Sequence, residues 1–364
     1  MSYSADCATW REIQMQPAVW REWADQLQTR SRQIQDWIAA RGIREVWFCG
    51  AGSSAYIGDV ICARPHPHLT LRGVATTDIV ACPQDYFPIP DDVLVVQFGR
   101  SGNSSETVGL LDLLDRSAPH VARLHITCNS ESALATRQSA GSGETQVLLL
   151  PDDTHDAGFA MTASFTTMLL SALAVLDHGV DLPSRLELLA DRAEGILAGL
   201  TANGMIQRPE RAIFLGSGPL KGIARESALK VLELTSGQTL TQWDSTLGYR
   251  HGPKAAAAPA ARFAVMVHPD AHTARYDLDV AREIAQQYPE AEVVTFGARG
   301  CDVTVEGCGD AAWDGVLFVL VAHVWSVMWS DALGLQIDNP FAGHGTLSRV
   351  VSGVTLYPWD AAQA

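Results

Sequence analysis

The sequence predicts an α/β protein built from two tandem, doubly wound parallel sheets, preceded by an N-terminal helical segment. Short apolar runs alternate with helical patterns along the chain, which is typical of parallel strands joined by helices. One unit, an apolar run followed by a Gly-x-Gly turn and a helix, occurs at residues 45–58 and again at 211–224. This repeat indicates that a single α/β unit has been duplicated.

Composition limits the classes of function. The chain has 364 residues, 47% of them hydrophobic, which is enough for two domains. A net charge of −15 argues against a broad surface for nucleic acid or an anionic membrane, so we expect neither as a partner. The odd count of 7 cysteines without a Cys-x-x-Cys pair indicates reduced thiols, and with a polar N-terminus it predicts a cytoplasmic protein.

The N-terminal segment up to about residue 41 has apolar residues at helical spacing, and Pro17 is expected to begin its second helix. A late apolar run at residues 316–328 contains His323 and is interpreted as a buried helix, too short for a membrane span. The predicted boundaries are residues 1–41 for the N-terminal helices, 42–180 for the first α/β domain, 181–208 for a helical linker, 209–345 for the second α/β domain and 346–364 for a C-terminal tail.

Two polar turns in the first half are candidate anion sites. The turn at residues 50–54 offers glycines, Ser53 and a helix N-terminus. A dinucleotide fingerprint is the rival interpretation, but Ala55 stands where its third glycine is required. The turn at residues 99–107 follows a strand at 93–98 that is apolar except for Gln97, and it carries five hydroxyl or amide side chains within seven positions. Such a turn can hold a phosphate without a lysine, although a capped helix start also favours Ser and Asn.

The second half carries a candidate acid–base set. Residues 225–234 form a predicted helix on which Glu226, Lys230 and Glu233 lie at i, i+4 and i+7, on one face. A loop with His251 follows, and together these groups are suited to proton transfer. The alternative is a solvated helix face with an ordinary Glu–Lys pair. Because one copy holds the polar turns and the other this helix, the sequence predicts an active site between the two copies.

Four motifs carry a resemblance to a known family: Gly-Ser-Ser at 52–54, Ser-Gly-Asn-Ser-Ser-Glu at 101–106, the helix at 226–234 and Arg-His-Gly-Pro-Lys at 250–254. With them the chain resembles a tandem sugar isomerase (SIS) protein over nearly its whole length. Segments 154–166, 215–235, 244–254, 275–279 and 349–358 resemble the AgaS group of galactosamine-6-phosphate deaminases and tagatose-6-phosphate ketose/aldose isomerases. The resemblance implies a phosphorylated amino sugar as substrate, no metal and no redox cofactor.

The resemblance also implies roles for particular residues. Glu233 would move a proton between C1 and C2, with Glu226 as the rival base, while Lys230 would support the open-chain sugar. His251 would open the sugar ring from a partner subunit, so a homodimer or larger homo-oligomer is expected. The implied phosphate contacts are Ser53, Ser54, Arg100, Ser101, Asn103 and Ser104, and further substrate contacts are Gly52, His155 and Thr162.

Two departures from the family pattern are visible. Gly99 stands where relatives of the synthase type have a serine, so one phosphate contact is missing or is replaced by Arg100. Arg349 or Ser352 stands near the position of a C-terminal lysine in the glutamine-dependent synthases. The chain shows no glutaminase domain, so the resemblance implies that ammonia is released rather than supplied.

Three alternatives stay open at this point. The chain could isomerise tagatose 6-phosphate without deamination, or act on a sugar phosphate as a lyase or epimerase, since proton abstraction serves all of these reactions. It could also be a non-catalytic sugar-phosphate sensor, although no DNA-binding segment is visible. His155, His272 and His344 are too far apart in sequence to indicate a metal site.

Overall fold

The computed structural model describes residues 7–202, 204, 206–257, 260–343 and 347–359. The chain divides into two compact units, each assembled from separate stretches. The first-sheet unit contains residues 23–155, 163–182 and the C-terminal tail from 347, and the second-sheet unit contains residues 1–22, 156–162 and 183–346.

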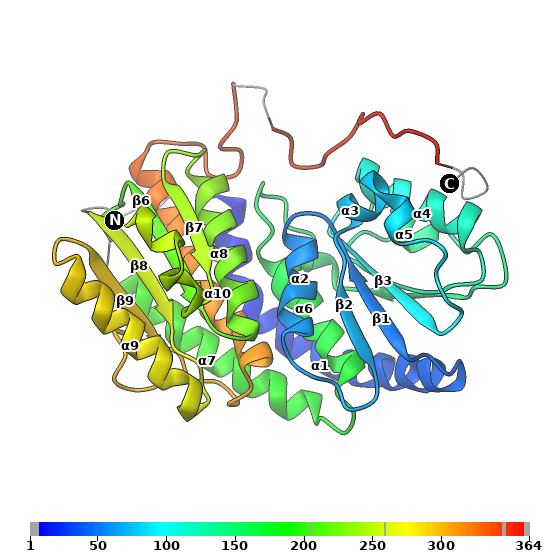
Figure 1. Cartoon of the computed structure of the whole chain (residues 1–364), viewed down its shortest axis with the longest axis horizontal. Coiled ribbons are helices and arrows are strands. Elements are labelled where there is room, and N and C mark those ends of the chain that lie inside the picture. The colour runs from blue at the N-terminus through cyan, green and yellow to red at the C-terminus, as the bar shows by residue number, and fades with distance from the viewer. Residues whose placement is uncertain (1–6, 203, 205, 258–259, 344–346, 360–364) are drawn as a thin grey trace. The chain divides into compact units, whose positions relative to one another are not determined.

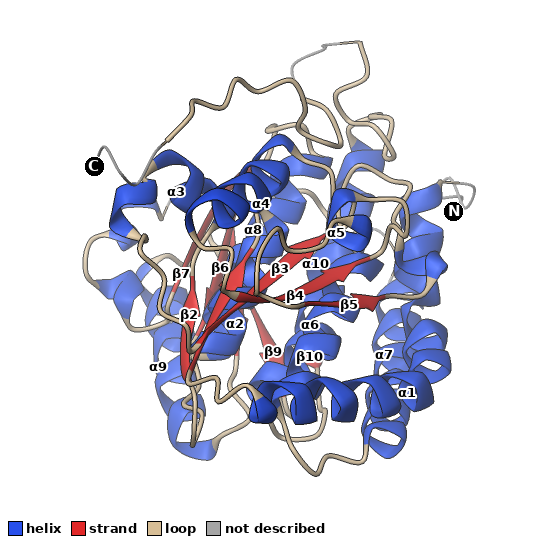
Figure 2. Ribbon diagram, turned by 90° about the vertical axis from the view of Figure 1, so that its right-hand side faces the viewer, coloured by secondary structure: helices blue, strands red, loops and turns tan. Residues whose placement is uncertain are grey.

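The first-sheet unit is built on five parallel strands in the order β2-β1-β3-β4-β5 (Figure 1). The strands are β1 (Glu45–Cys49), β2 (Thr70–Gly73), β3 (Val93–Gly99), β4 (Ala122–Thr127) and β5 (Thr145–Leu149). The connecting helices are α2 (Ser53–Cys62), α3 (Thr76–Ala81), α4 (Ser105–Ser117), α5 (Ala133–Thr136) and α6 (Ala163–Leu176), with short 3-10 turns at Pro83–Asp85 and Asp152–Thr154. Figure 2 shows α4 and α5 on one side of β3–β5, and α1 and α6 on the other. Every residue of β3 and β4 is buried, as expected of central strands covered on both faces.

The second-sheet unit repeats this architecture with the order β7-β6-β8-β9-β10. Its strands are β6 (Arg211–Gly216), β7 (Leu240–Asp244), β8 (Ala261–Met266), β9 (Glu292–Gly297) and β10 (Val303–Thr304). Its helices are α7 (Leu182–Ala202), α8 (Pro219–Leu234), α9 (Ala271–Gln287) and α10 (Ala311–Ala332), with 3-10 turns at Gly248–Arg250 and Pro253–Ala256. In Figure 1, α9 covers one face of this sheet and α8 and α10 the other. The two sheets therefore share one strand order, which confirms the duplicated doubly wound fold.

Three edge strands, β2, β7 and β10, are absent from the sequence prediction. Their residues are mostly exposed or half-buried, so they lack the continuous apolar run that marks the central strands. Strands β1, β3 and β6 lie where the apolar runs within residues 45–58, 93–98 and 211–224 predict them.

The expectation that Pro17 begins a second helix is wrong, because α1 is one helix, Ala8–Ala40, with Pro17 inside it. Proline lacks the N–H that would bond to the carbonyl of Ile13 four residues earlier. In the structure the side-chain amide of Gln16 donates to that carbonyl at 3.4 Å, which replaces the missing bond. Buried Ile13 before the proline, and buried Trp20 and Trp23 after it, keep the helix packed on both sides.

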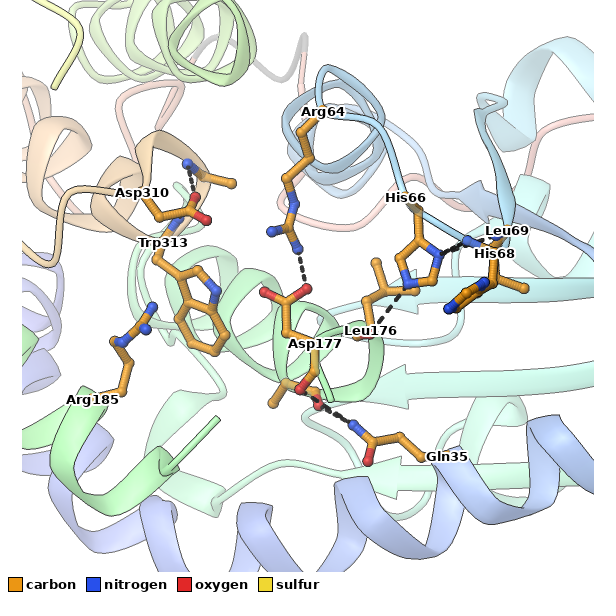
Figure 3. A network of polar contacts seen from close by, with 12 residues as sticks. Gln35, Arg64, His66, His68, Leu69, Leu176, Asp177, Arg185, Asp310 and Trp313 are labelled. Atoms are coloured by element: carbon orange, nitrogen blue, oxygen red, sulfur yellow. Dashed lines mark hydrogen bonds and ion pairs between the residues drawn. The ribbon is translucent and has the colours of Figure 1, made fainter. Parts of the chain in front are cut away.

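The end of α6 is held by a polar network within the first-sheet unit (Figure 3). Arg64 Nη2 contacts Asp177 Oδ1 at 2.6 Å, and Gln35 Nε2 donates to the Ala174 carbonyl at 3.0 Å. His66 Nδ1 accepts from the backbone of Leu69 at 3.0 Å, so its Nε2 carries the proton that faces the Leu176 carbonyl. These contacts tie α1, α2 and α6 together beneath the sheet.

Helix α10 confirms the buried helix predicted around residues 316–328. The expectation that this segment is too short for a membrane span is wrong, because α10 would qualify as one by length and hydropathy. The whole of its apolar window is nevertheless buried inside the protein. It is therefore the core helix of the second-sheet unit.

Three carboxylates meet where α1 contacts residues 156–162 in the second-sheet unit. Glu12 accepts from the backbone N–H groups of Ala157 and Gly158, Asp156 accepts from Thr162, and Asp338 accepts from Thr9. Burial raises the pKa of Glu12 to about 7, and the charge of Asp156 raises it further against the two backbone N–H groups. Glu12 is only 6% exposed, so its proton is shielded within this cluster.

We predict that Glu12 makes stability fall as pH rises. Its pKa is raised from 4.5 to about 7 on folding, so the folded state binds a proton that the unfolded chain has released. As pH rises from 4.5 to above 7, the free energy of unfolding of the wild type should fall by about 1–3 kcal/mol relative to that of E12Q. Urea unfolding at pH 4.5, 6 and 8 measures this, with E22Q, an exposed acid of the same helix, as control. Parallel pH curves for wild type and E12Q would contradict the prediction.

Candidate functional site

The two polar turns of the first-sheet unit lie at the point where its strand order reverses. Strands β1 and β3 are parallel neighbours, with Cys49 level with Gln97, and each runs directly into one of the turns. Ligands of open α/β sheets bind at the carboxyl ends of strands beside such a reversal. The topology therefore brings residues 50–54 and 99–105 to the same edge of the sheet, as the sequence analysis requires.

The first turn depends on glycine. Gly52 precedes α2 with φ 56° and ψ −131°, a conformation that L-residues rarely adopt. A Cβ on Gly50 would lie 2.4 Å from the backbone of Ser54, so only glycine permits this close approach. Ser53 and Ser54 are the first two residues of α2 and are 5% and 4% exposed. Their backbone and hydroxyl groups lie at a helix N-terminus, which attracts anions.

The second turn, residues 99–105, is a capped helix start. Ser104 is the N-cap of α4: its Oγ accepts from the Thr107 N–H at 3.4 Å and lies 2.7 Å from the Thr107 hydroxyl. Ser101 Oγ accepts from the Asn103 N–H at 3.3 Å, and Gly102 between them has φ 62°. A left-handed residue inside a polar turn creates the backbone concavity that binds anions. Capping and anion binding are thus compatible in this loop.

This turn is fixed by the loop that follows β4. Asn103 Oδ1 accepts from the Ala133 N–H at 2.8 Å, and Asn129 Nδ2 donates to the Ser101 carbonyl at 3.1 Å. A Cβ on Gly102 would lie 2.5 Å from Ser132 Oγ, so the two loops are in direct contact. The sequence analysis missed Asn129 and Ser132, because only the parallel pairing of β3 with β4 places them here.

The C-terminal tail, residues 347–359, contacts the second turn (Figure 1). Arg100, which is 6% exposed, donates from Nη2 to the Arg349 carbonyl at 2.9 Å. The Ser105 N–H at the start of α4 donates to the Val351 carbonyl at 3.2 Å. The tail is anchored further along by Trp359, whose ring centroid lies 5.4 Å from that of Phe87. Arg349 and Ser352 are themselves exposed.

Gly99, one of the departures from the family pattern, has a local packing reason. A Cβ at this position would lie 2.8 Å from Leu134 Cδ1 and 3.1 Å from Gly102 Cα. Leu134 therefore fills the volume that a serine side chain at position 99 would need.

The second-sheet unit has the same glycine turn, but a carboxylate of the chain accepts hydrogen bonds there. Gly218 precedes α8 with φ 56° and ψ −130°, which matches Gly52. Here Ser217 Oγ donates to Asp277 Oδ1 at 2.6 Å, and the His268 N–H donates to Asp277 Oδ2 at 2.9 Å. Asp277 is fully buried, so a carboxylate of the chain itself accepts from groups at this turn. Its negative charge disfavours a phosphate at the turn of residues 216–218, a role that the sequence analysis did not identify.

Helix α8 brings Glu226, Lys230 and Glu233 together, as their spacing predicts. Lys230 Nζ lies 2.7 Å from Glu233 Oε2 and 3.4 Å from Glu226 Oε1. The side chains of Glu226 and Lys230 are 0% and 1% exposed, whereas that of Glu233 is 23% exposed. The solvated-face alternative is therefore wrong for this trio, and Glu233 is the carboxylate that a substrate could reach.

His251 is exposed at the end of the turn Gly248–Arg250. Its neighbours are fixed: Arg250 Nη2 contacts Glu283 at 2.6 Å, and Lys254 also pairs with Glu283. Its backbone N–H donates to the Gly248 carbonyl at 2.9 Å.

The remaining predicted substrate residues belong to different units. Thr162 is fully buried in the second-sheet unit, and its hydroxyl donates to Asp156 Oδ1 at 2.8 Å. His155 is half-buried at the end of the turn Asp152–Thr154 in the first-sheet unit. Among the described residues, no group of three His, Cys, Asp or Glu is arranged to hold a metal; His344 lies outside those residues.

The two sheets share this strand order; one copy has polar turns at helix N-termini, and the other has a helix with a buried Glu–Lys–Glu trio. These features define the class of tandem phosphosugar isomerases of the SIS type. The structure superposes on tagatose-6-phosphate ketose/aldose isomerase from Escherichia coli with a TM-score of 0.86, at 32% identity and over 99% of both chains. No protein-family model matches the chain.

Sequence comparison narrows the class. The chain is 36% identical to D-galactosamine-6-phosphate deaminase AgaS from Shewanella sp. (strain ANA-3), over 96% of this chain and 92% of the relative. It is 42% identical to a Streptomyces coelicolor protein that carries the AgaS name, over 96% and 95% of the two chains. The chain belongs to the AgaS family.

We predict that a side chain at position 102 disrupts the second turn. G102A adds a left-handed strain of about 1–2 kcal/mol and an overlap with Ser132. G42A is the matched control, because Gly42 has φ 65° but nothing within 4 Å of its Cβ. Both variants should unfold at lower urea concentration, and G102A should also raise the KM for a sugar phosphate at least tenfold. An unchanged KM in folded G102A would contradict the prediction.

Proposed function

We propose that this chain is an enzyme that converts D-galactosamine 6-phosphate and water into D-tagatose 6-phosphate and ammonia. The observation that carries the proposal is the match, over nearly the whole chain, to a D-galactosamine-6-phosphate deaminase and to a tagatose-6-phosphate isomerase structure. These two names describe the substrate and the product of a single reaction. Loss of the stereocentre at C2 of a galactose skeleton leaves the C4 configuration that distinguishes tagatose.

The chemistry needs three steps. The sugar ring opens to expose the C1 aldehyde. A base then removes the proton from C2 and a proton is returned to C1, so that C1 becomes a hydroxymethyl group and C2 an imine. Water adds to the imine carbon, and the C–N bond breaks to leave a ketone and ammonia, which makes the last step a hydrolysis.

The first-sheet unit supplies the phosphate contacts in this proposal. Ser53 and Ser54 at the start of α2, with Ser101, Asn103 and Ser104 in the second turn, surround two helix N-termini. Arg100 adds a positive charge in the same turn, with Gly52 providing the backbone shape. Phosphate binding far from the reacting carbons orients the open-chain sugar. Among the described contacts of Ser101, Asn103 and Ser104, none is with a carboxylate such as Asp277, which supports the choice of this copy.

Glu233 is the proton-transfer base in this proposal. Its 23% exposure supports the choice over Glu226, whose side chain is 0% exposed. Lys230, at 2.7 Å, orients the Glu233 carboxylate. Its positive charge stabilises the negative charge that develops on the C1 oxygen when the C2 proton is removed.

Isomerisation without deamination is the second candidate function. It is favoured by the name of the Escherichia coli structure and uses the same proton transfer, with a C2 hydroxyl in place of the amine. The two candidates differ in whether ammonia leaves.

Ammonia release from D-galactosamine 6-phosphate tests the proposal. We expect stoichiometric ammonia and tagatose 6-phosphate, with D-glucosamine 6-phosphate as the epimer control. Interconversion of tagatose 6-phosphate with galactose 6-phosphate, without ammonia from either amino sugar, would establish the second candidate instead. No turnover of any of these sugars would favour a sensor.

We predict that E233Q stops proton transfer and leaves binding nearly intact. Glutamine keeps the size and hydrogen bonding of the side chain but accepts no proton, so kcat should fall about 10²–10⁴-fold. Deuterium exchange from solvent into the substrate carbon should also cease, while the KM changes little. E226Q, on the same helix face, is the matched control and should retain exchange. Loss of exchange in E226Q alone would assign the base to Glu226.

We further propose that the protein is a cytoplasmic homodimer or larger homo-oligomer in which His251 opens the sugar ring of the partner subunit's substrate. The exposed position of His251 on a loop fixed by Glu283 supports a role across an interface. The seven cysteines, all free thiols, support a reducing compartment.

Subunit mixing tests the role of His251. Homogeneous E233Q and H251A proteins should both be nearly inactive, because each oligomer lacks one essential group. After subunit exchange, a mixed oligomer contains one site with both groups intact, so activity should recover to a measurable fraction of wild type. Mass spectrometry of differently labelled subunits verifies the exchange. Complete exchange without recovered activity would show that His251 acts within its own chain.

A further inference from the structure

The second turn of the first-sheet unit accepts two hydrogen bonds from the backbone of the short helix α5. The Ala133 N–H donates to Asn103 Oδ1 at 2.8 Å, and the Leu134 N–H donates to the Gly102 carbonyl at 3.3 Å. The Leu134 side chain also fills the space beside Gly99. The position of α5 therefore determines the shape of the turn.

His125, on β4, fixes the position of α5. Its Nδ1 lies 2.7 Å from the Leu134 carbonyl, and because a carbonyl only accepts, Nδ1 carries the ring proton. The carbonyls in the last turn of a helix have no partner within that helix, and α5 has only 4 residues. The imidazole of His125 therefore supplies the donor that α5 itself lacks at Leu134.

The ring of His125 is neutral and buried. It is 0% exposed, and its Nε2 has no hydrogen-bond partner in the part of the chain that the structure describes. Burial lowers the pKa of His125 to about 4; the bond to Leu134 opposes this shift and the charge of Arg123 adds to it. The ring therefore has a single N–H at pH 7, and Leu134 accepts it. An apolar side chain would avoid burying an unpaired Nε2, so the bond to Leu134 is the reason why a histidine suits this position.

We propose that His125 is a positioning residue for phosphate binding: its Nδ1–H holds α5, and α5 holds the second turn in the shape that receives the substrate phosphate. Several donors must reach the phosphate oxygens at once, so a small shift of the turn weakens binding. This inference rests on the proposed function, in which Ser101, Asn103 and Ser104 contact the phosphate. His125 acts through Leu134 and does not itself touch the substrate.

Three variants of the whole protein test this role. H125L removes the donor, whereas H125N keeps one, because the amide nitrogen of asparagine is as many bonds from Cα as Nδ1 of histidine. I126A is the control for lost packing, since Ile126 is equally buried and its side chain points to the opposite face of β4.

Steady-state kinetics with D-galactosamine 6-phosphate compare the variants. We expect H125L to raise the KM about tenfold while kcat stays within about twofold of wild type, because uniform binding is lost. H125N should recover most of the wild-type KM, and I126A should lower the melting temperature but leave the KM unchanged. An unchanged KM in folded H125L, or a rise as large in H125N or I126A, would overturn the proposal.

An NMR measurement on the wild type separates this inference from the proposed function. The chain contains 11 histidines, so ¹⁵N-histidine labelling gives few ring signals, and H125N assigns those of His125. We expect a neutral His125 ring with its proton on Nδ1 at pH 7. We also expect faster amide hydrogen exchange across residues 99–107 in H125L, whether or not the enzyme turns over galactosamine 6-phosphate.

A ring proton on Nε2, or unchanged exchange across the turn in folded H125L, would overturn the positioning role. A wild type that neither binds nor converts sugar phosphates, while both signatures are present, would reject only the proposed function and would still support the role of His125 in holding the turn.

Discussion

The close approach of each first strand to the helix that follows it is the constraint on which both units depend. A Cβ on Gly50 or Gly216 would lie 2.4 or 2.5 Å from the backbone four residues on, a distance that side chains do not tolerate. Gly52 and Gly218 then turn the chain with the same φ of 56°. These glycines place the N-termini of α2 and α8 against the ends of β1 and β6. The residues in the first turn of each helix therefore lie at the switch point of its sheet. Function can therefore diverge between the copies without any change of backbone.

The copies diverge in charge. In the first-sheet unit, the turns contain hydroxyls, amides and Arg100, and among the described contacts of Ser101, Asn103 and Ser104 none is with a carboxylate. In the second-sheet unit, the Ser217 hydroxyl and the His268 N–H already donate to Asp277, whose carboxylate carries the negative charge that an anion would bring. The duplicated polar turn thus already holds a carboxylate in one copy, and the helix of that copy carries a buried ammonium beside two carboxylates.

Much of the fold could be predicted from the sequence, because the central strands are continuous apolar runs and the glycine turns recur at matching places. The edge strands could not, since β2 and β7 depend on pairing with β1 and β6 rather than on their own pattern. In the candidate site, the trio on α8 followed from helical spacing alone. The contact of Arg100 with the tail and the role of Asp277 join residues far apart in sequence, and no local pattern indicates either one. The chemical roles of these residues were assigned from the family resemblance. Helical spacing shows which side chains lie close together, but it does not show which of them gives or takes a proton.

The burial of the trio has a consequence for where its charge lies. Lys230 is 1% exposed, and an ammonium at that depth is stable only beside a counter-charge. Glu226 is equally buried and is the deeper counter-ion of Lys230. Because the trio has two carboxylates and one ammonium, one negative charge remains among these three groups. Glu233 is the single member of the trio that reaches the surface of its unit. The buried lysine therefore has two counter-charges, one wholly buried and one partly exposed, so a change in the exposed carboxylate would still leave the ammonium beside Glu226.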